Sequence, residues 1–263
     1  MVKFGFVIDL SRCVGCRTCV EACKVENNTP SGAFWMWVFR VEEGKYPNVR
    51  VRFLPRLCQH CNNPPCVKVC PVAARFQRED GFVLTDFNRC IGCRYCQVAC
   101  PYGVNYFNWK RPSTQQYFDW KNGEGDDLYG KGRMRDYVGG AIPPYKNPDH
   151  DQSWGEEKRL VSGGSHYVGV MGKCTWCVHR VAKGLEPACA AACPMRVLNF
   201  GDLDDPQSKV SLMLAEKRSF RLLEELNTEP RTYYVGYPPF SEDARILDKS
   251  ARPEINLPRA KTT

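Results

Sequence analysis

The chain lacks any long apolar run. No stretch of its 263 residues approaches the roughly 18 apolar residues that a membrane-spanning helix requires. It begins without a signal-type apolar segment, a twin arginine or a transit peptide. We therefore expect neither a membrane span nor an export signal in the chain itself. It also lacks a long basic run or an aromatic–basic module, which argues against nucleic-acid binding.

Cysteine, by contrast, is abundant and regularly spaced. The sixteen cysteines form four groups: Cys13, Cys16, Cys19, Cys23; Cys58, Cys61, Cys66, Cys70; Cys90, Cys93, Cys96, Cys100; and Cys174, Cys177, Cys189, Cys193. The third group reads C-x2-C-x2-C-x3-C followed by Pro101, which is the bacterial spacing that ligates [4Fe–4S] clusters. The first group repeats this spacing without the proline. The second and fourth widen the middle gap but end in C-x3-C-P.

Two other uses of cysteine fit this pattern less well. Structural zinc sites also use C-x2-C pairs, but they close with two such pairs and rarely end in Cys-Pro. A disulfide framework is typical of shorter, secreted chains with a signal peptide and irregular spacing. The repeated spacing therefore favours four [4Fe–4S] clusters as the cofactors.

The spacing also predicts which cysteines share a cluster. In two-cluster ferredoxins the fourth cysteine of a run binds the other cluster. Cys58 and Cys90 are 32 residues apart, so the second and third groups already complete one such unit. The first and fourth groups are left to complete another. The expected ligand sets are Cys13, Cys16, Cys19 with Cys193; Cys174, Cys177, Cys189 with Cys23; Cys58, Cys61, Cys66 with Cys100; and Cys90, Cys93, Cys96 with Cys70.

We expect an α+β fold of two bacterial-ferredoxin-like lobes, one inserted in the other, with long loops. Lobe A comprises residues 1–49 plus 169–236 and carries the first and fourth groups. Lobe B comprises residues 50–110 and carries the second and third groups. Residues 111–168 form an irregular, glycine-rich insert, which is either a surface loop or a partner contact. Residues 237–263 form a charged, proline-rich tail that binds a partner.

The chain pattern predicts short elements. Strands are expected at residues 3–9, 34–42, 48–54, 73–77, 82–86, 197–202 and 231–236, the last being the final strand. A short helix is expected at 17–25, and a second helix with Asp205 as its N-cap should run to about Lys217, with Val210, Leu212 and Leu214 inward.

The formal net charge is +8, and the clusters account for it. A [4Fe–4S] cluster with four thiolates carries about −2, so four clusters bring the loaded protein to about zero. Basic residues near the cysteines either tune the clusters or are ordinary surface charges. They are Arg17, Arg56, Arg94, Lys173, His179 and Arg180.

With four such groups in this order, the chain resembles the iron–sulfur electron-transfer subunit of the complex iron–sulfur molybdoenzymes, the dimethyl sulfoxide and polysulfide reductase family. The segments that carry the resemblance are DLSRCVGCRTC (9–19), CQHCNNPPCVKVCP (58–71), CIGCRYCQVACPYG (90–103), KCTWCVHRV (173–181), GLEPACAAACP (184–194) and FGDLDDPQS (200–208).

The resemblance implies two partners: a catalytic subunit with a molybdenum or tungsten bis-pterin cofactor, and a membrane anchor that handles quinone. The chain would pass electrons between them without catalytic residues of its own. It would be peripheral on the cell membrane through these partners, with lobe A facing the catalytic subunit and lobe B near the quinone. The alternative is a free-standing, soluble polyferredoxin, which seldom needs a long insert and a charged tail.

Overall fold

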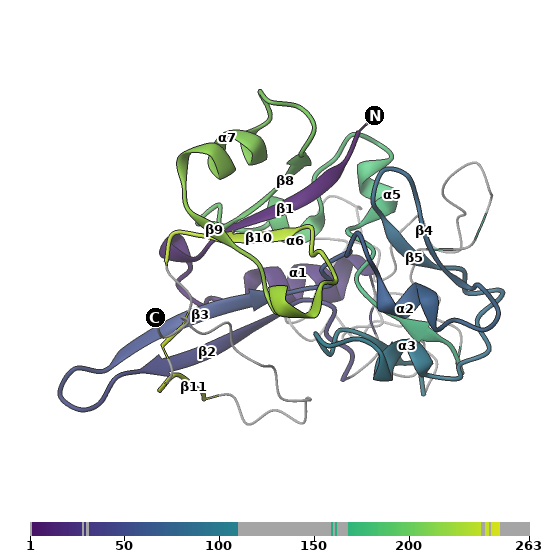
Figure 1. The fold of residues 1–263 in the computed structure, drawn as a ribbon, viewed down its shortest axis with the longest axis horizontal. Coiled ribbons are helices and arrows are strands. Elements are labelled where there is room, and N and C mark those ends of the chain that lie inside the picture. The colour runs from purple at the N-terminus through teal and green to yellow at the C-terminus, as the bar shows by residue number, and fades with distance from the viewer. Residues whose placement is uncertain are drawn as a thin grey trace, which may run out of the picture.

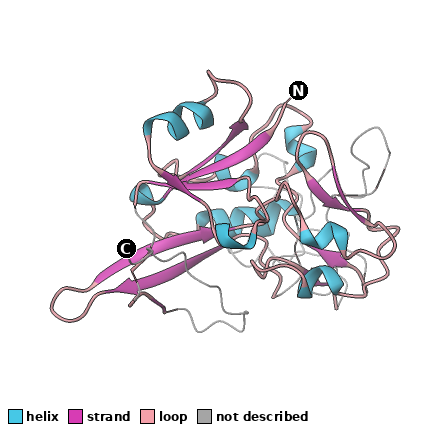
Figure 2. Ribbon diagram, viewed as in Figure 1, coloured by secondary structure: helices cyan, strands magenta, loops and turns pink. Residues whose placement is uncertain are grey.

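Figure 1 shows the computed structural model, which describes residues 2–27, 29, 32–109, 159, 161, 168–237, 240, 241 and 243–247. In these ranges short helices and strands are mixed, as the α+β prediction expects (Figure 2). None of the helices described there is long and apolar enough to cross a membrane. The predicted insert, apart from residues 159, 161 and 168, lies outside the described residues, as does the end of the predicted tail.

The main sheet is built from both ends of the chain. β1 (Phe4–Asp9) pairs in parallel with β10 (Thr232–Val235) and antiparallel with β8 (Leu198–Asp202). β9 (Ser219–Phe220) extends the sheet beyond β10. Figure 1 shows the purple β1 lying between the green β8 and the yellow-green β10. β1 is buried from its second residue onward, because one face packs on the main core and the other on α7 (Lys209–Glu216).

Beside this sheet lies a long hairpin of β2 (Trp37–Glu43) and β3 (Arg50–Arg56). A third strand, β11 (Arg245–Ile246), pairs with the outer edge of β2. The expectation that the strand at 231–236 is the last one is therefore wrong. Phe240 is fully buried, so the beginning of the predicted tail packs on its own chain. The apolar residues Phe240, Ile246 and Leu247 stand among prolines and charges without a period of two, so the sequence did not predict such a strand.

The segment with the second and third cysteine groups consists of very short elements. α2 (Pro65–Lys68), β4 (Arg75–Gln77), β5 (Val83–Thr85) and α3 (Tyr95–Val98) follow one another. α2 packs against α3, and β4 pairs with β5. β6 (Tyr106–Phe107) then pairs with β7 (Met171–Gly172) from the far side of the insert. Both this pairing and the β2–β3 hairpin cross the predicted lobe boundaries, and the division into two lobes stays a prediction.

The remaining helices are short. They are η1 (Leu10–Arg12), α1 (Thr18–Asn27), α5 (Val178–Val181), α6 (Ala188–Ala191) and η4 (Glu224–Leu226). α7 begins later than expected, because Ser208, and not Asp205, accepts the capping hydrogen bond from the Ser211 amide. Val210 is buried as predicted, but Leu212 is exposed. The early part of the predicted helix is instead a turn in which Asp205 accepts from the Gln207 amide.

One aromatic cluster joins the two halves of the molecule. Trp176 is fully buried and meets Phe6 and Phe200 of the main sheet at ring-centroid distances of 5.5 and 5.6 Å. It meets Phe82, which immediately precedes β5, at 5.8 Å. Edge-to-face contacts of this kind stabilise a core beyond the area that they bury. The cysteine loops therefore sit on one shared core.

Candidate metal centres

Left-handed backbone turns shape the cysteine loops. In the first and third groups, glycine and arginine occupy equivalent positions with positive φ: Gly15 (71°) and Arg17 (63°), and Gly92 (69°) and Arg94 (65°). N–H groups in such turns point to one side and form a concave surface that favours anions. Gly92 has no room for a side chain, because a Cβ atom there would meet the Gly169 carbonyl. The loop can therefore wrap closely around three cysteines.

The first predicted ligand set lines one cavity. Cys13, Cys16, Cys19 and Cys193 surround about 340 Å³ of empty space, counted with its opening to solvent. β1 leads through η1 into Cys13, and β8 begins soon after Cys193, so the pairing of these strands brings distant cysteines together. Burial, and then the thiols of Cys13, Cys193 and Cys16, raise the pKa of Cys19 to about 12.

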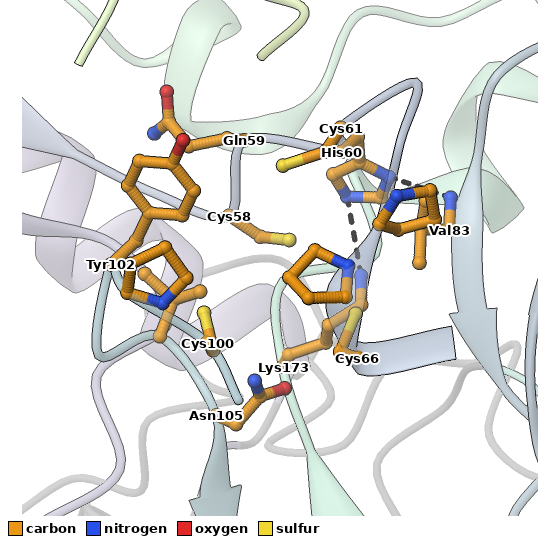
Figure 3. A pocket seen from close by; sticks show the side chains of 14 residues that line it. Cys58, Gln59, His60, Cys61, Cys66, Val83, Cys100, Tyr102, Asn105 and Lys173 are labelled. Carbon is orange, nitrogen blue, oxygen red and sulfur yellow. Dashed lines mark hydrogen bonds between the residues drawn. The ribbon is translucent and has the colours of Figure 1, made fainter. Parts of the chain in front are cut away.

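The second predicted set surrounds a similar cavity. Cys58, Cys61, Cys66 and Cys100 line about 340 Å³ of empty space, again counted with its opening. Figure 3 shows their sulfur atoms around one common space. Cys66 lies on α2 and Cys100 follows α3, so the packing of these two helices brings the thiols together. Burial is the main cause that raises the pKa of Cys66 to about 11, and the Arg75 charge opposes it.

The third predicted set joins positions far apart in the sequence. Cys23 on α1 and the thiols of Cys174, Cys177 and Cys189 are all buried. Asn27 Nδ2 lies 3.6 Å from Cys23 Sγ and 3.7 Å from Cys177 Sγ. Burial, and then Cys174 and Cys177, raise the pKa of Cys23. The packing of α1 against α6 places these thiols side by side.

Arg75 contacts two cysteines of the fourth predicted set. Its members are Cys90, Cys93, Cys96 and Cys70. The backbone amide of Arg75 donates to Cys70 Sγ (3.4 Å), and Arg75 Nη2 donates to Cys96 Sγ (3.3 Å). Cys90 Sγ accepts from the Met171 amide (3.4 Å). Cys93 is exposed. The sulfur atoms thus lie around β4, α3 and β7.

The chemistry of these sites suits iron–sulfur clusters. Each predicted set offers four cysteine thiols, and a [4Fe–4S] cluster takes four thiolates, one on each of four iron atoms. Burial is the main cause that raises the pKa of Cys19, Cys23 and Cys66, and bound iron deprotonates the thiols that hold it. The four-cysteine cavities therefore suit [4Fe–4S] clusters.

Two stacked rings connect the Cys58 set with the Cys174 set. Trp176 Nε1 donates to the Cys58 carbonyl (3.2 Å), and its ring stacks on His60 at a centroid distance of 4.0 Å. His60 Nδ1 accepts from the Val83 amide (2.9 Å), so Nε2 carries the proton and donates to the Cys174 carbonyl (3.0 Å). Burial is the main cause that lowers the pKa of His60, which keeps the ring neutral. The two rings therefore fix the Cys58 loop and the Cys174 loop relative to each other.

Comparison with known proteins identifies the family. Two family models match, each described as a 4Fe-4S dicluster domain: one covers residues 12–74, and the other residues 49–116 and 164–203. The arsenate respiratory reductase iron–sulfur subunit ArrB of Shewanella sp. is 40% identical over 89% of this chain and 96% of its own length. The chain belongs to the iron–sulfur electron-transfer subunits of the complex iron–sulfur molybdoenzymes.

Other relatives of this iron–sulfur subunit have similar coverage. A selenate reductase subunit of Mesobacillus selenatarsenatis is 39% identical over 89% of this chain and 72% of its own length. The menaquinone reductase iron–sulfur cluster-binding subunit of Nitratidesulfovibrio vulgaris is 34% identical over 89% of both chains. The resemblance inferred from the cysteine motifs is thereby confirmed, and the fold carries ferredoxin-type [4Fe–4S] domains.

The basic residues of this iron–sulfur subunit fall into two kinds. Lys173 is buried and lines the Cys58 cavity, next to Cys174 in the sequence. Arg94 instead lies over the rings of Phe107 and Trp109, at 4.1 and 4.2 Å. Sequence reasoning missed Arg75, although it contacts two cysteines. No spacing rule marks that position, because the pairing of β4 with β5 is what turns it inward.

Proposed function

We propose that the subunit carries four [4Fe–4S] clusters between a molybdenum or tungsten bis-pterin catalytic subunit and a quinone-linked membrane anchor. The observation that supports the proposal is that the predicted Cys13 and Cys58 sets each line one cavity, while cysteines of the other two sets lie near one another. One-electron uptake and release is the chemistry that such clusters supply when bound. The protein's own residues hold the thiols, exclude water and fix the order of the sets.

Neighbouring thiols support a linear order of the four sets. Cys19 raises the pKa of Cys23, after burial and the two nearer thiols. Cys58 is the second cause, after burial, that raises the pKa of Cys174 to about 12. The Cys58 and Cys90 sets meet at Arg75, whose charge acts on thiols of both. The proposed order is therefore the Cys13 set, the Cys174 set, the Cys58 set and the Cys90 set.

Exposure singles out the two ends of this order. Cys16, in the Cys13 set, and Cys93, in the Cys90 set, are exposed, and the other fourteen cysteines are buried or half-buried. Exposed apolar side chains flank them: Val14 is 56% and Ile91 is 63% exposed. Such side chains suit a desolvated contact with a partner. We place the catalytic subunit at the Cys16 end and the anchor at the Cys93 end, following the family resemblance.

The proposed domains follow the same division. Lobe A (1–49 plus 169–236) would carry the Cys13 and Cys174 sets, and lobe B (50–110) would carry the Cys58 and Cys90 sets. The relative named as a menaquinone reductase subunit supports a quinone-linked anchor. The insert 111–168 and the residues beyond 247 are the proposed partner contacts. Through these partners the subunit would be peripheral on the membrane.

A pair of matched variants tests this function in the assembled complex. Native subunit should contain about sixteen iron atoms, from four clusters of four. Cys96→Ser and Cys19→Ser each remove a ligand, one at each end. Both should stop quinone-linked turnover, while dye-linked turnover at the catalytic subunit survives.

Reduction by quinol separates the two ends. Added quinol should reduce the remaining clusters in Cys19→Ser but not in Cys96→Ser, as followed by electron paramagnetic resonance. The reverse pattern would place the quinone at the Cys16 end. A subunit that purifies without any catalytic partner would instead favour the free-standing polyferredoxin.

A further inference from the structure

A buried guanidinium lies where the Cys58 and Cys90 sets meet. Arg75 opens β4, and its side chain is only 2% exposed. Its Nη2 donates to Cys96 Sγ (3.3 Å), and its backbone amide donates to Cys70 Sγ (3.4 Å). Both of these thiols belong to the Cys90 set.

The same guanidinium also interacts with the Cys58 set. Cys66, a member of the Cys58 set, lies on α2, which packs against the strand β4 that Arg75 opens. Cys66 and Cys96 also belong to one buried cluster with Val83 and Met171. One cation therefore lies beside thiols of two different sets.

Some N–H donors of the guanidinium have no acceptor. Its Nε and Nη1 are buried and have no hydrogen-bond partner among the described residues, and the described carboxylates form no ion pair with it. Arg56, which is equally buried, also has an Nε without a partner among the described residues, but its Nη1 donates to the carbonyls of Tyr102 and Gly103. A buried charged donor without an acceptor is strongly unfavourable. Anionic sulfur on either side would supply the acceptors that the protein does not.

We propose that Arg75 is a positioning residue that raises the reduction potentials of the two neighbouring clusters together. The proposal rests on the proposed function, in which the Cys58 and Cys90 sets each hold a cluster. A nearby positive charge and N–H donors to sulfur favour the reduced, more negative form. When one electron passes between the two clusters, one is oxidised and the other is reduced. A cation close to both clusters therefore shifts both reduction potentials relative to those of the other two clusters. It leaves the difference between the two shifted potentials unchanged.

The test is a redox titration, monitored by electron paramagnetic resonance, of the assembled complex with Arg75→Met, Arg75→Lys and the control Arg78→Met. Arg78 lies three residues further along and pairs with Asp80 at 2.7 Å near the surface. In Arg75→Met two of the four midpoint potentials should fall, by similar amounts, and the other two should stay. Arg75→Lys should show smaller shifts, and Arg78→Met none.

Several outcomes would overturn the proposal. With iron content intact, unmoved potentials in Arg75→Met, a shift of one cluster alone, or equal shifts of all four would each do so. If Arg75→Met loses iron instead, the proposal requires that only these two clusters are lost and that Arg75→Lys retains them. Loss of iron from all four clusters, or the same loss in Arg75→Lys, would assign Arg75 a role in folding. A native subunit that lacks iron at the Cys58 and Cys90 sets would contradict the proposed function itself.

Discussion

At the scale of single residues, buried cations lie between the cysteine sets. Lys173 Nζ donates to the Cys174 carbonyl (2.9 Å), and its side chain lines the cavity of the Cys58 set. It is a minor cause that lowers the pKa of both Cys66 and Cys174, against the larger effect of burial. Lys173 therefore occupies the junction of the Cys174 and Cys58 sets, as Arg75 occupies the next junction.

This position leads to a prediction for Lys173→Met. Removing the charge should lower the midpoint potentials of the Cys174 and Cys58 clusters and leave that of the Cys90 cluster unchanged, because a cation stabilises the more negative, reduced form. A redox titration of the complex measures this. Lys209→Met, on the exposed side of α7, is the control. A fall confined to the Cys90 cluster would contradict the assignment.

At the scale of elements, the sequence predicted the longer strands and missed the shortest ones. The pattern FGFVID predicts a strand because β-branched and aromatic residues favour one, and β1 forms there. The two-residue strands β6, β7, β9 and β11 were not predicted, since two residues carry no periodicity. The α7 start was misplaced because Asp205 and Ser208 are both good caps, and only packing decides between them.

The ligand grouping stays a prediction from spacing, although two of its four sets line cavities in the structure, and no spacing predicts the contacts around the thiols. The crossing rule for the fourth cysteine depends on local chain geometry that each motif repeats. Arg75 and Asn27 reach the thiols of Cys96 and Cys177, and His60 reaches the Cys174 carbonyl, through tertiary packing that no motif encodes. Conversely, Arg94 lies next to Cys93 in sequence, yet its guanidinium packs on aromatic rings.

The hairpin edge gives a prediction at this scale. Phe240 is fully buried, and the Arg52 guanidinium lies 4.2 Å from its ring centroid. Phe240→Ala should destabilise the folded subunit by roughly 3–5 kcal/mol, the range for a large core truncation. Thermal unfolding under anaerobic conditions measures the loss. Tyr237→Ala, whose ring is 42% exposed beside the same Arg52, should cost much less; equal losses would mean that β11 does not depend on Phe240.

At the scale of the whole molecule, segments from the two ends of the chain pack together and bring cysteines of the first and fourth groups close to one another. The β1–β8 and α1–α6 contacts bring Cys193 to the Cys13 loop and Cys23 to the Cys174 loop. With the four clusters proposed above, each of about −2, the formal charge of +8 would become about zero. Folding of the two ends and cluster binding are therefore expected to be coupled, as in other metal-nucleated domains.

The crossing of Cys23 is the sharpest test of this arrangement. Asn27 Nδ2 lies within 3.7 Å of both Cys23 Sγ and Cys177 Sγ, and the two thiols are 154 positions apart, from 177 − 23. Cys23→Ser should therefore damage the cluster of Cys174, Cys177 and Cys189 and affect that of Cys13, Cys16 and Cys19 less. Iron analysis and electron paramagnetic resonance of the complex distinguish the two.

Cys70→Ser is the matched variant at the other end. It should damage the cluster of Cys90, Cys93 and Cys96, because Cys70 is the predicted fourth ligand of that cluster. Each substitution removes a cysteine that lies in one motif and is predicted to bind the cluster of another. If Cys23→Ser abolishes the cluster of Cys13, Cys16 and Cys19 and leaves the distant one intact, the fourth cysteine closes its own loop. The chain ends would then meet for packing alone, since neither end would supply a ligand to the other.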